Sequence, residues 1–284
     1  MLAPYCWTCL VIILIAIIKN VILYGSDAAK QAALEWLYAS VYCAGDSYSE
    51  PLVIKQIGAI WFLWATFWGS IFLRCTLEMK KGTRLTTIMI LFAMGRWSRR
   101  LLWFPFSIQA GCCAVLFMYF GFLLRGVIEE IKRASLESKV MIALFAFWIW
   151  GDFIKNFQSF WLVHCDIGRG SIDILGSICG CYIILLFSWY LEKHNNKVSR
   201  ALAFVGKNSL FVLCLHVVEL DMFPWRSWAQ KLIVYGFPSK LEFYIILIGK
   251  FIFIIWGTVI CANWNFIRKL FGLIPIERKG KRYG

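Results

Sequence analysis

The feature that most constrains this chain is a series of apolar runs, each close to the length that a membrane-spanning helix requires. A helix needs about 20 predominantly apolar residues to cross the hydrocarbon core of a bilayer. Such runs lie at about 4–24, 57–74, 85–104, 107–125, 139–155, 171–191, 202–220 and 241–262. They fill more than half of the 284 residues, so the connections are short and no soluble domain fits between them. We therefore predict an all-α, polytopic transmembrane helical bundle of about 8 spans, forming a single domain over residues 1–284.

The composition excludes the other broad classes of protein. Hydrophobic residues make up 61% of the chain and charged residues 16%, with 15 Trp and 24 Phe. An ordinary soluble domain carries roughly a quarter charged residues, so most of this apolar surface requires lipid as its solvent. The net charge is +14, but the basic residues are spread between the apolar runs, which is typical of membrane-protein loops rather than of nucleic-acid binding. We expect the lipid bilayer to be a partner and nucleic acid not to be one.

The distribution of Lys and Arg predicts the orientation. With eight spans and both termini cytoplasmic, the inner loops and the C-terminal tail carry seventeen basic residues and the outer loops carry ten. The run at 85–104 is the weakest, and without it the count becomes twelve inside against fifteen outside. The positive-inside rule therefore favours eight spans. This orientation places segments 25–56, 155–170 and 221–240 outside, and the basic tail from Arg268 to Arg282 inside.

The cysteines predict no metal or redox site. Cys6 and Cys9 form a C-x-x-C pattern, but they lie in an apolar run without a nearby histidine, and a metal site would need further ligands. Most of the eleven cysteines lie within apolar runs, where cysteine behaves as a small apolar residue. Only Cys43 and Cys165 fall in outer segments where pairing is conceivable.

One histidine stands out from the three in the chain. His164 and His194 lie in connecting segments, and we expect both at the surface. His216 lies inside an apolar run, and Glu219 follows three positions later on the same helix face. A carboxylate beside an imidazole fixes its tautomer and prepares it to act as a general base for a hydroxyl. The same spacing also fits a buried histidine that bonds a neighbouring helix.

Further polar residues interrupt the apolar runs. Lys207, Asn208 and Ser209 enter the membrane together just before the His216 helix. The ammonium of Lys207 suits a phosphate or the membrane interface, while the two polar side chains suit a substrate or a neighbouring helix. Lys250 lies in the middle of an apolar run and needs a partner; Glu219 and Asp152 are both candidates.

These strings together resemble the acyltransferase-3 family of membrane O-acyltransferases, in its fucose 4-O-acetylase-like branch. The run from Gly206 to His216 is similar to the family's "G-(K/R)-N-S-L" signature, which leads to a His at this distance. Trp61-Phe62-Leu63 resembles the branch's "WFL" helix, and the strings at 104–107 and 121–125 resemble its "LPWS … G-x-L-L-R" pattern. The resemblance covers about residues 55–220.

The resemblance implies an activity and a set of site residues. The family moves an acyl group, usually acetyl, from acetyl-CoA to a sugar hydroxyl of a cell-surface polysaccharide or its lipid-linked precursor, without a metal. We expect an integral protein of a bacterial plasma membrane, with His216 and Glu219 as catalytic residues. Lys207, Asn208, Ser209 and Trp61 are then the substrate- or donor-binding residues. Its partners are acetyl-CoA and a glycan or lipid-linked sugar, and its oligomeric state stays open.

One departure from the family leaves two other functions open. The family has about ten helices and a catalytic His in the first of them, whereas no His precedes His164 here. This predicts a chain that lacks the family's two N-terminal helices. The alternatives are therefore a non-catalytic acyltransferase fragment, or a glycolipid transporter or flippase that uses the same buried polar groups as a path.

Overall fold

The computed structural model describes residues 2–49, 52–194, 196–234, 238 and 241–273. Over these residues the chain is helical, and the only β-structure is an isolated antiparallel bridge between Tyr48 and Ile54. The prediction of an all-α helical bundle with long apolar helices is confirmed. The basic tail beyond residue 273 lies outside the described residues.

The elements follow one another with short connections, except for two loops before α3 and α7. The helices are α1 (Leu2–Tyr24), α2 (Ser26–Tyr42), α3 (Trp61–Leu77), α4 (Lys81–Ser98), α5 (Ile108–Arg133), α6 (Leu136–Lys155), α7 (Ser171–His194), α8 (Lys197–Lys207), α9 (Ser209–Met222), α10 (Trp225–Val234), α11 (Glu242–Asn263) and α12 (Asn265–Leu270). Three short 3-10 turns join them: η1 (Gly58–Ile60), η2 (Pro105–Ser107) and η3 (Leu162–His164).

Five of the described helical segments are long and apolar enough to cross a membrane: α1, η1 with α3, η2 with most of α5, α7 and α11. The bent pair of α8 and α9 would make a sixth if the two helices form one span. The runs expected at 85–104 and 139–155 do form helices, α4 and α6. Both carry charged residues toward their two ends, so they fall outside this set. Eight spans and a cytoplasmic location for both termini stay predictions.

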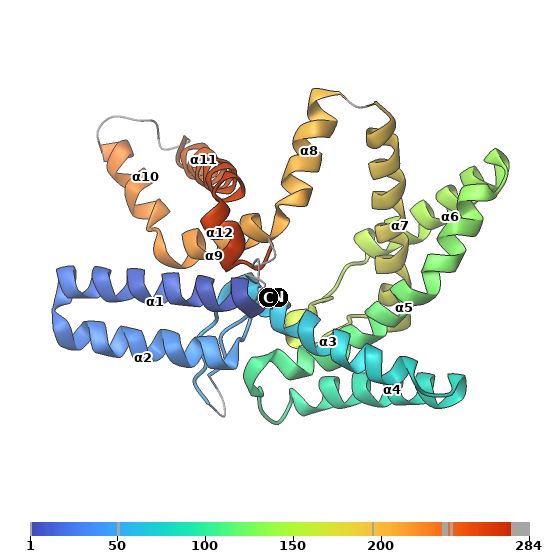
Figure 1. Cartoon of the computed structure of the whole chain (residues 1–284), viewed down its shortest axis with the longest axis horizontal. Helices are drawn as coiled ribbons and strands as arrows, with labels where there is room; N and C mark the ends of the chain where they lie inside the picture. The colour runs from blue at the N-terminus through green and yellow to red at the C-terminus, as the bar shows by residue number, and fades with distance from the viewer. Residues whose placement is uncertain (1, 50–51, 195, 235–237, 239–240, 274–284) are drawn as a thin grey trace, which may run out of the picture.

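The segment at 25–56, expected as an outer loop, contains the helix α2 instead. Gly25, at φ +93°, turns the chain sharply after α1, and α2 returns antiparallel along α1 (Figure 1). Trp36 and Ala39 of α2 are buried in a cluster with Ile12 and Ala16 of α1. The charged residues of α2, Asp27, Lys30 and Glu35, are exposed.

The run at 202–220, expected as one span, is broken. The axes of α8 and α9 differ by 72°, and Asn208 lies between them outside helical geometry, at φ −109° and ψ 18°. The amide of its side chain donates to the carbonyl oxygen of Phe204 at 2.9 Å, which helps to end α8. This break separates an amphipathic helix from the apolar helix that carries His216.

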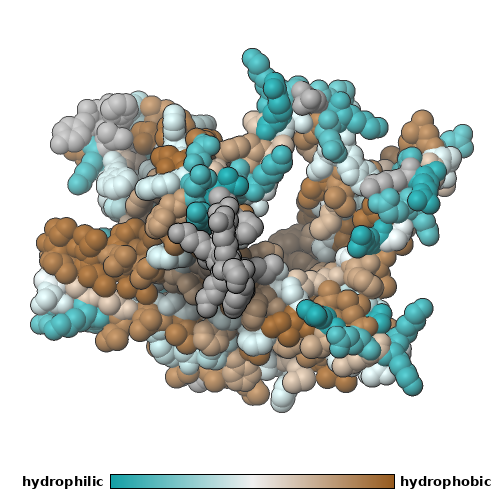
Figure 2. Space-filling view, in the orientation of Figure 1, coloured by the Kyte–Doolittle hydropathy of each residue, from teal (hydrophilic) through white to brown (hydrophobic). Residues whose placement is uncertain are grey.

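Two buried clusters hold the helices together. One joins α1, α2, η1 and α9, and the other joins α3, α4, α5 and the loops before α3 and α7. Trp61 packs against both clusters. Elsewhere large apolar side chains face outward: Ile22 of α1 is 74% exposed and Trp148 of α6 is 70% exposed. Figure 2 shows this apolar surface along α1, as expected of helices that are solvated by lipid.

Candidate functional site

The main polar centre is the carboxylate of Glu219, which is fully buried on α9. α9 packs between α1 and α11. His216 lies one helical turn before Glu219, and its imidazole Nδ1 is 2.9 Å from Glu219 Oε1. The pair predicted from the spacing therefore forms a direct hydrogen bond.

Two further residues complete the surroundings of the carboxylate. The Lys250 ammonium, from α11, lies 3.4 Å from Glu219 Oε1. The indole N–H of Trp225, at the start of α10, donates to Glu219 Oε2. A buried carboxylate is stable only when it is paired and hydrogen-bonded, and here three groups from three helices satisfy it. Sequence reasoning did not find Trp225, because the chain turns between α9 and α10 and helix periodicity therefore does not relate Trp225 to Glu219.

A glycine on α11 allows this arrangement. A Cβ atom added to Gly249 would lie only 2.7 Å from the Trp225 ring, so a larger residue would push the indole away. Gly249 precedes Lys250 directly. The same turn of α11 thus makes room for one partner of Glu219 and supplies another.

The imidazole of His216 is open on its other side. Its side chain is 42% exposed, and no described protein group bonds its Nε2. If Nδ1–H donates to Glu219, Nε2 is an unprotonated acceptor that can take a proton from a hydroxyl. Among the described residues, no group of His, Cys, Asp and Glu could hold a metal ion.

A groove lies beside this centre, on the side of α10 and α11. Its cavity measures about 560 Å³, and its lining includes Trp225, Arg226, Phe243 and Lys250. Trp225 and Lys250 both contact Glu219. The groove is therefore separated from the His216–Glu219 pair by single side chains.

The other predicted site residues lie apart from His216. Lys207, Asn208 and Ser209 lie at the bend between α8 and α9, roughly 10 Å from His216 along the helix axis, given a rise of 1.5 Å per residue. Lys207 and Ser209 are exposed. Trp61 packs instead beside Gly45, where an added Cβ atom would lie 2.3 Å from its ring.

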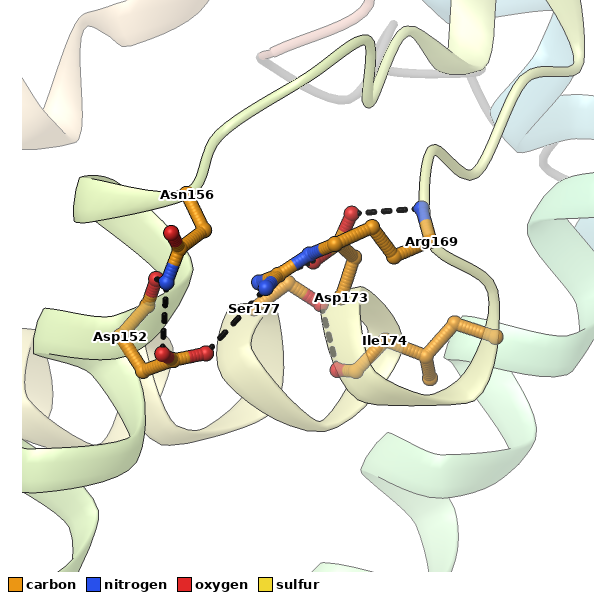
Figure 3. A network of polar contacts seen from close by, with 6 residues as sticks. All are labelled: Asp152, Asn156, Arg169, Asp173, Ile174 and Ser177. Carbon is orange, nitrogen blue, oxygen red and sulfur yellow. Dashed lines mark hydrogen bonds and ion pairs between the residues drawn. The ribbon is translucent and has the colours of Figure 1, made fainter.

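Asp152, the other candidate partner for Lys250, has a different role. Its carboxylate Oδ2 lies 3.3 Å from Arg169 Nη1, and Arg169 also pairs with the buried Asp173 at 2.8 Å (Figure 3). Asn156 donates to Asp152 Oδ1 at 2.7 Å. This network connects the end of α6 to the start of α7. Asp152 is therefore paired with Arg169, and the partner of Lys250 is Glu219.

His164, which we expected at the surface, is partly buried and forms a second polar centre. Its Nε2 lies 3.0 Å from Asp46 Oδ2, and its Nδ1 lies 3.4 Å from the Tyr48 hydroxyl. Arg99 donates to the backbone carbonyl of His164, and the ring stacks on Trp161. Burial raises the pKa of Tyr48 above its usual range, so its hydroxyl remains a donor. The centre joins the loops before α3 and α7.

The cysteines form no disulfide in the structure. All eleven are free. Cys43 and Cys165, the two for which pairing was conceivable, are both buried and unpaired. No disulfide therefore contributes to either polar centre.

The fold and the site define a class of protein rather than a named family. The class is an all-α integral-membrane protein with a buried carboxylate bonded to a partly exposed imidazole. Comparisons with protein-family models, with curated proteins and with solved structures find no match for this chain. The family resemblance thus rests on the motifs in the sequence alone.

Proposed function

We propose that this protein is a membrane O-acetyltransferase that moves an acetyl group from acetyl-CoA to a sugar hydroxyl of a cell-surface polysaccharide or its lipid-linked precursor. The observation that carries the proposal is the 2.9 Å contact between His216 Nδ1 and the fully buried carboxylate of Glu219. This is the arrangement that a general base for a hydroxyl nucleophile requires. The motif resemblance supplies the substrates and the location, a bacterial plasma membrane.

The reaction assigns a proton to each step. The acceptor hydroxyl gives its proton to His216 Nε2 while its oxygen attacks the thioester carbonyl of acetyl-CoA. The tetrahedral intermediate then breaks its carbon–sulfur bond, and the imidazolium returns the proton to the leaving thiolate. The products are the acetyl ester and CoA as its thiol. Glu219 stabilises the imidazolium that exists between the two proton transfers.

Lys250 and Trp225 act through Glu219. Their contacts at Oε1 and Oε2 fix the carboxylate, so its orientation toward His216 is set before substrate binds. Positioned acid–base groups of this kind contribute about 10²–10⁴-fold to rate. Lys250 and Trp225 are therefore positioning residues in this proposal.

The residues at the α8–α9 bend are placed to bind the phosphate end of acetyl-CoA, away from the reacting thioester. Lys207 is exposed and carries the charge that a phosphate of CoA would need. CoA is an elongated molecule, so a residue that holds its phosphates need not lie next to the reacting carbonyl. Asn208 and Ser209 belong to the same end of α9. Trp61, packed between the two buried clusters, has a supporting role in this proposal.

A second function has one specific observation in its favour. Transporters often carry discontinuous helices near a buried polar site, and α8 and α9 form a helix broken by 72°. The buried Glu219, which pairs with Lys250 of α11, lies on the helix that follows the break. A glycolipid flippase is therefore the runner-up, and it requires no acetyl-CoA.

The decisive experiment compares two histidine variants. The protein is reconstituted in membranes with its glycan acceptors and supplied with radiolabelled acetyl-CoA. We expect His216→Ala to reduce acetyl transfer by at least about 10²-fold, because it removes the base. His194→Ala is the matched control: His194 lies at the end of α7 beside Tyr190, and its loss leaves transfer unchanged. Unaltered transfer by His216→Ala would refute the proposal.

A transport assay distinguishes the flippase from the acetyltransferase. If the purified wild-type protein moves a labelled glycolipid between leaflets without consuming acetyl-CoA, the flippase is correct and the acetyltransferase is wrong. Both variants are first compared for expression and thermal unfolding, so that a folding defect is not taken for a catalytic one.

A further inference from the structure

The groove beside Glu219 has two kinds of lining. Its two ionisable side chains, Arg226 and Lys250, are both cations. The rest of the lining is aliphatic, aromatic or proline. A cavity of about 560 Å³ lies within the range of small-molecule sites, which is about 300–1,000 Å³.

Of the two cations in the groove, only Lys250 has a carboxylate partner among the described residues. Lys250 pairs with Glu219 at 3.4 Å, and Glu219 also serves His216. In the part of the chain that the structure describes, no acidic group lies within ion-pair distance of Arg226. Arg226 is exposed at the start of α10. The groove therefore offers a positive charge to an anion.

The apolar part of the groove follows the first two turns of α11. Phe243, Ile246, Leu247 and Lys250 are spaced three, four and seven residues from the first, so they share one face of the helix. Phe243 is 67% exposed. α11 is one of the segments long and apolar enough to cross a membrane. An apolar stripe that ends at two cations matches a molecule with an anionic head and a hydrocarbon chain.

We propose that this groove binds a lipid phosphate, with the phosphate on Arg226 and Lys250 and the chain along Phe243, Ile246 and Leu247. A planar guanidinium forms paired hydrogen bonds with phosphate oxygens. A free inorganic anion would leave the apolar wall unused. A neutral lipid would leave the Arg226 charge without a partner.

The position of the groove indicates which class of acceptor molecule would reach His216. Lys250 and Trp225 line the groove and contact Glu219, which holds His216. A sugar carried on a lipid phosphate would thus have its head group near the base. This step rests on the proposed function and selects the lipid-linked precursor over the finished polysaccharide; the lipid binding itself does not depend on acetyl transfer.

The test uses two lipids that differ only in the phosphate. The delipidated full-length protein is titrated with phosphatidic acid and with diacylglycerol of the same chains, and binding is measured by native mass spectrometry. We expect phosphatidic acid to bind at least about tenfold more tightly, because only its phosphate can accept charge-assisted hydrogen bonds from the two cations. Equal binding of the two lipids would overturn the proposal, and so would full competition by inorganic phosphate.

Variants locate the site and separate this inference from the enzymatic one. We expect Arg226→Gln to weaken phosphatidic acid about tenfold or more, while Lys231→Gln, on the same helix and outside the lining, has no effect. His216→Ala retains lipid binding. If Arg226→Gln binds phosphatidic acid as well as the wild type does, the groove is not the lipid site, even if His216→Ala abolishes acetyl transfer. If the protein binds the lipid but transfers no acetyl group, the lipid site is upheld and the enzymatic proposal is not.

Discussion

The described part of the protein contains two histidine–carboxylate pairs that are nearly equal in length and opposite in exposure. His216 lies 2.9 Å from Glu219, and His164 lies 3.0 Å from Asp46. The Glu219 side chain is 0% exposed and that of Asp46 is 45% exposed, whereas the His216 ring is 42% exposed and the His164 ring 22%. In the first pair the carboxylate is sealed and the ring is open; in the second the reverse holds.

This difference distinguishes the imidazole that we propose as a general base from one that joins two loops. Both ring nitrogens of His164 have protein partners, Asp46 and Tyr48, so no nitrogen is left for a substrate. His216 has one protein partner through Nδ1 and an accessible Nε2. Both histidines share the short contact to a carboxylate, so the accessible Nε2 of His216 is the feature that supports our proposal for this residue.

The largest fall in the free energy of unfolding is expected from Glu219→Gln. This change keeps the shape of the side chain but leaves the Lys250 ammonium without its counter-charge. Breaking a buried ion pair costs about 3–5 kcal/mol, so the free energy of unfolding should fall by about that amount, as measured by thermal or denaturant unfolding in lipid nanodiscs. Adding Lys250→Met should restore part of the loss. A single variant as stable as the wild type would contradict the pairing.

An intermediate fall in the free energy of unfolding is expected from His164→Ala. It removes two hydrogen bonds between the loops before α3 and α7, each contributing about 0.5–1.5 kcal/mol. The free energy of unfolding should fall by about 1–3 kcal/mol, and hydrogen exchange at 43–49 should increase. Acetyl transfer per folded molecule should persist, and its loss in a folded variant would make the second centre part of the active site.

The smallest change in stability is expected at Asp166, which lies in the same loop as His164 and is bonded by Ser159. Burial opposes its ionisation, but hydrogen bonds from Ser159 and from the Gly168 amide hold the pKa of Asp166 below its usual value. A carboxyl with a lowered pKa stabilises the fold when ionised, and this stabilisation disappears as the pH falls through that pKa. Ser159→Ala should therefore lower stability slightly at neutral pH and have less effect in acid. An equal effect at both pH values would exclude the linkage.

The fold was predictable wherever the apolar pattern was long. Residues 4–24 and 241–262 became the continuous helices α1 and α11. α2 was missed because its charged residues lie on one face, and a hydropathy average hides the buried face that holds Trp36. The break at Asn208 depends on one residue that ends a helix, and such a local feature does not change the average over a span.

The candidate site was predictable only where its members lie one turn apart on the same helix. His216 and Glu219 are three residues apart, so helix geometry places them together. The choice between Glu219 and Asp152 for Lys250 depends on how α11 packs on α9, which the sequence does not specify. Asp46 and His164 are 118 positions apart, and no periodic pattern relates them.

Gly249 has a consequence for how variants of this protein are interpreted. It carries no functional group, yet the absence of a side chain there is what admits the Trp225 indole to Glu219. A bulkier residue would displace a hydrogen-bond donor on one helix and thereby misalign an ion pair and a base on another. A genetic screen would then score a volume change at a chemically inert position as a lesion of the proposed active site.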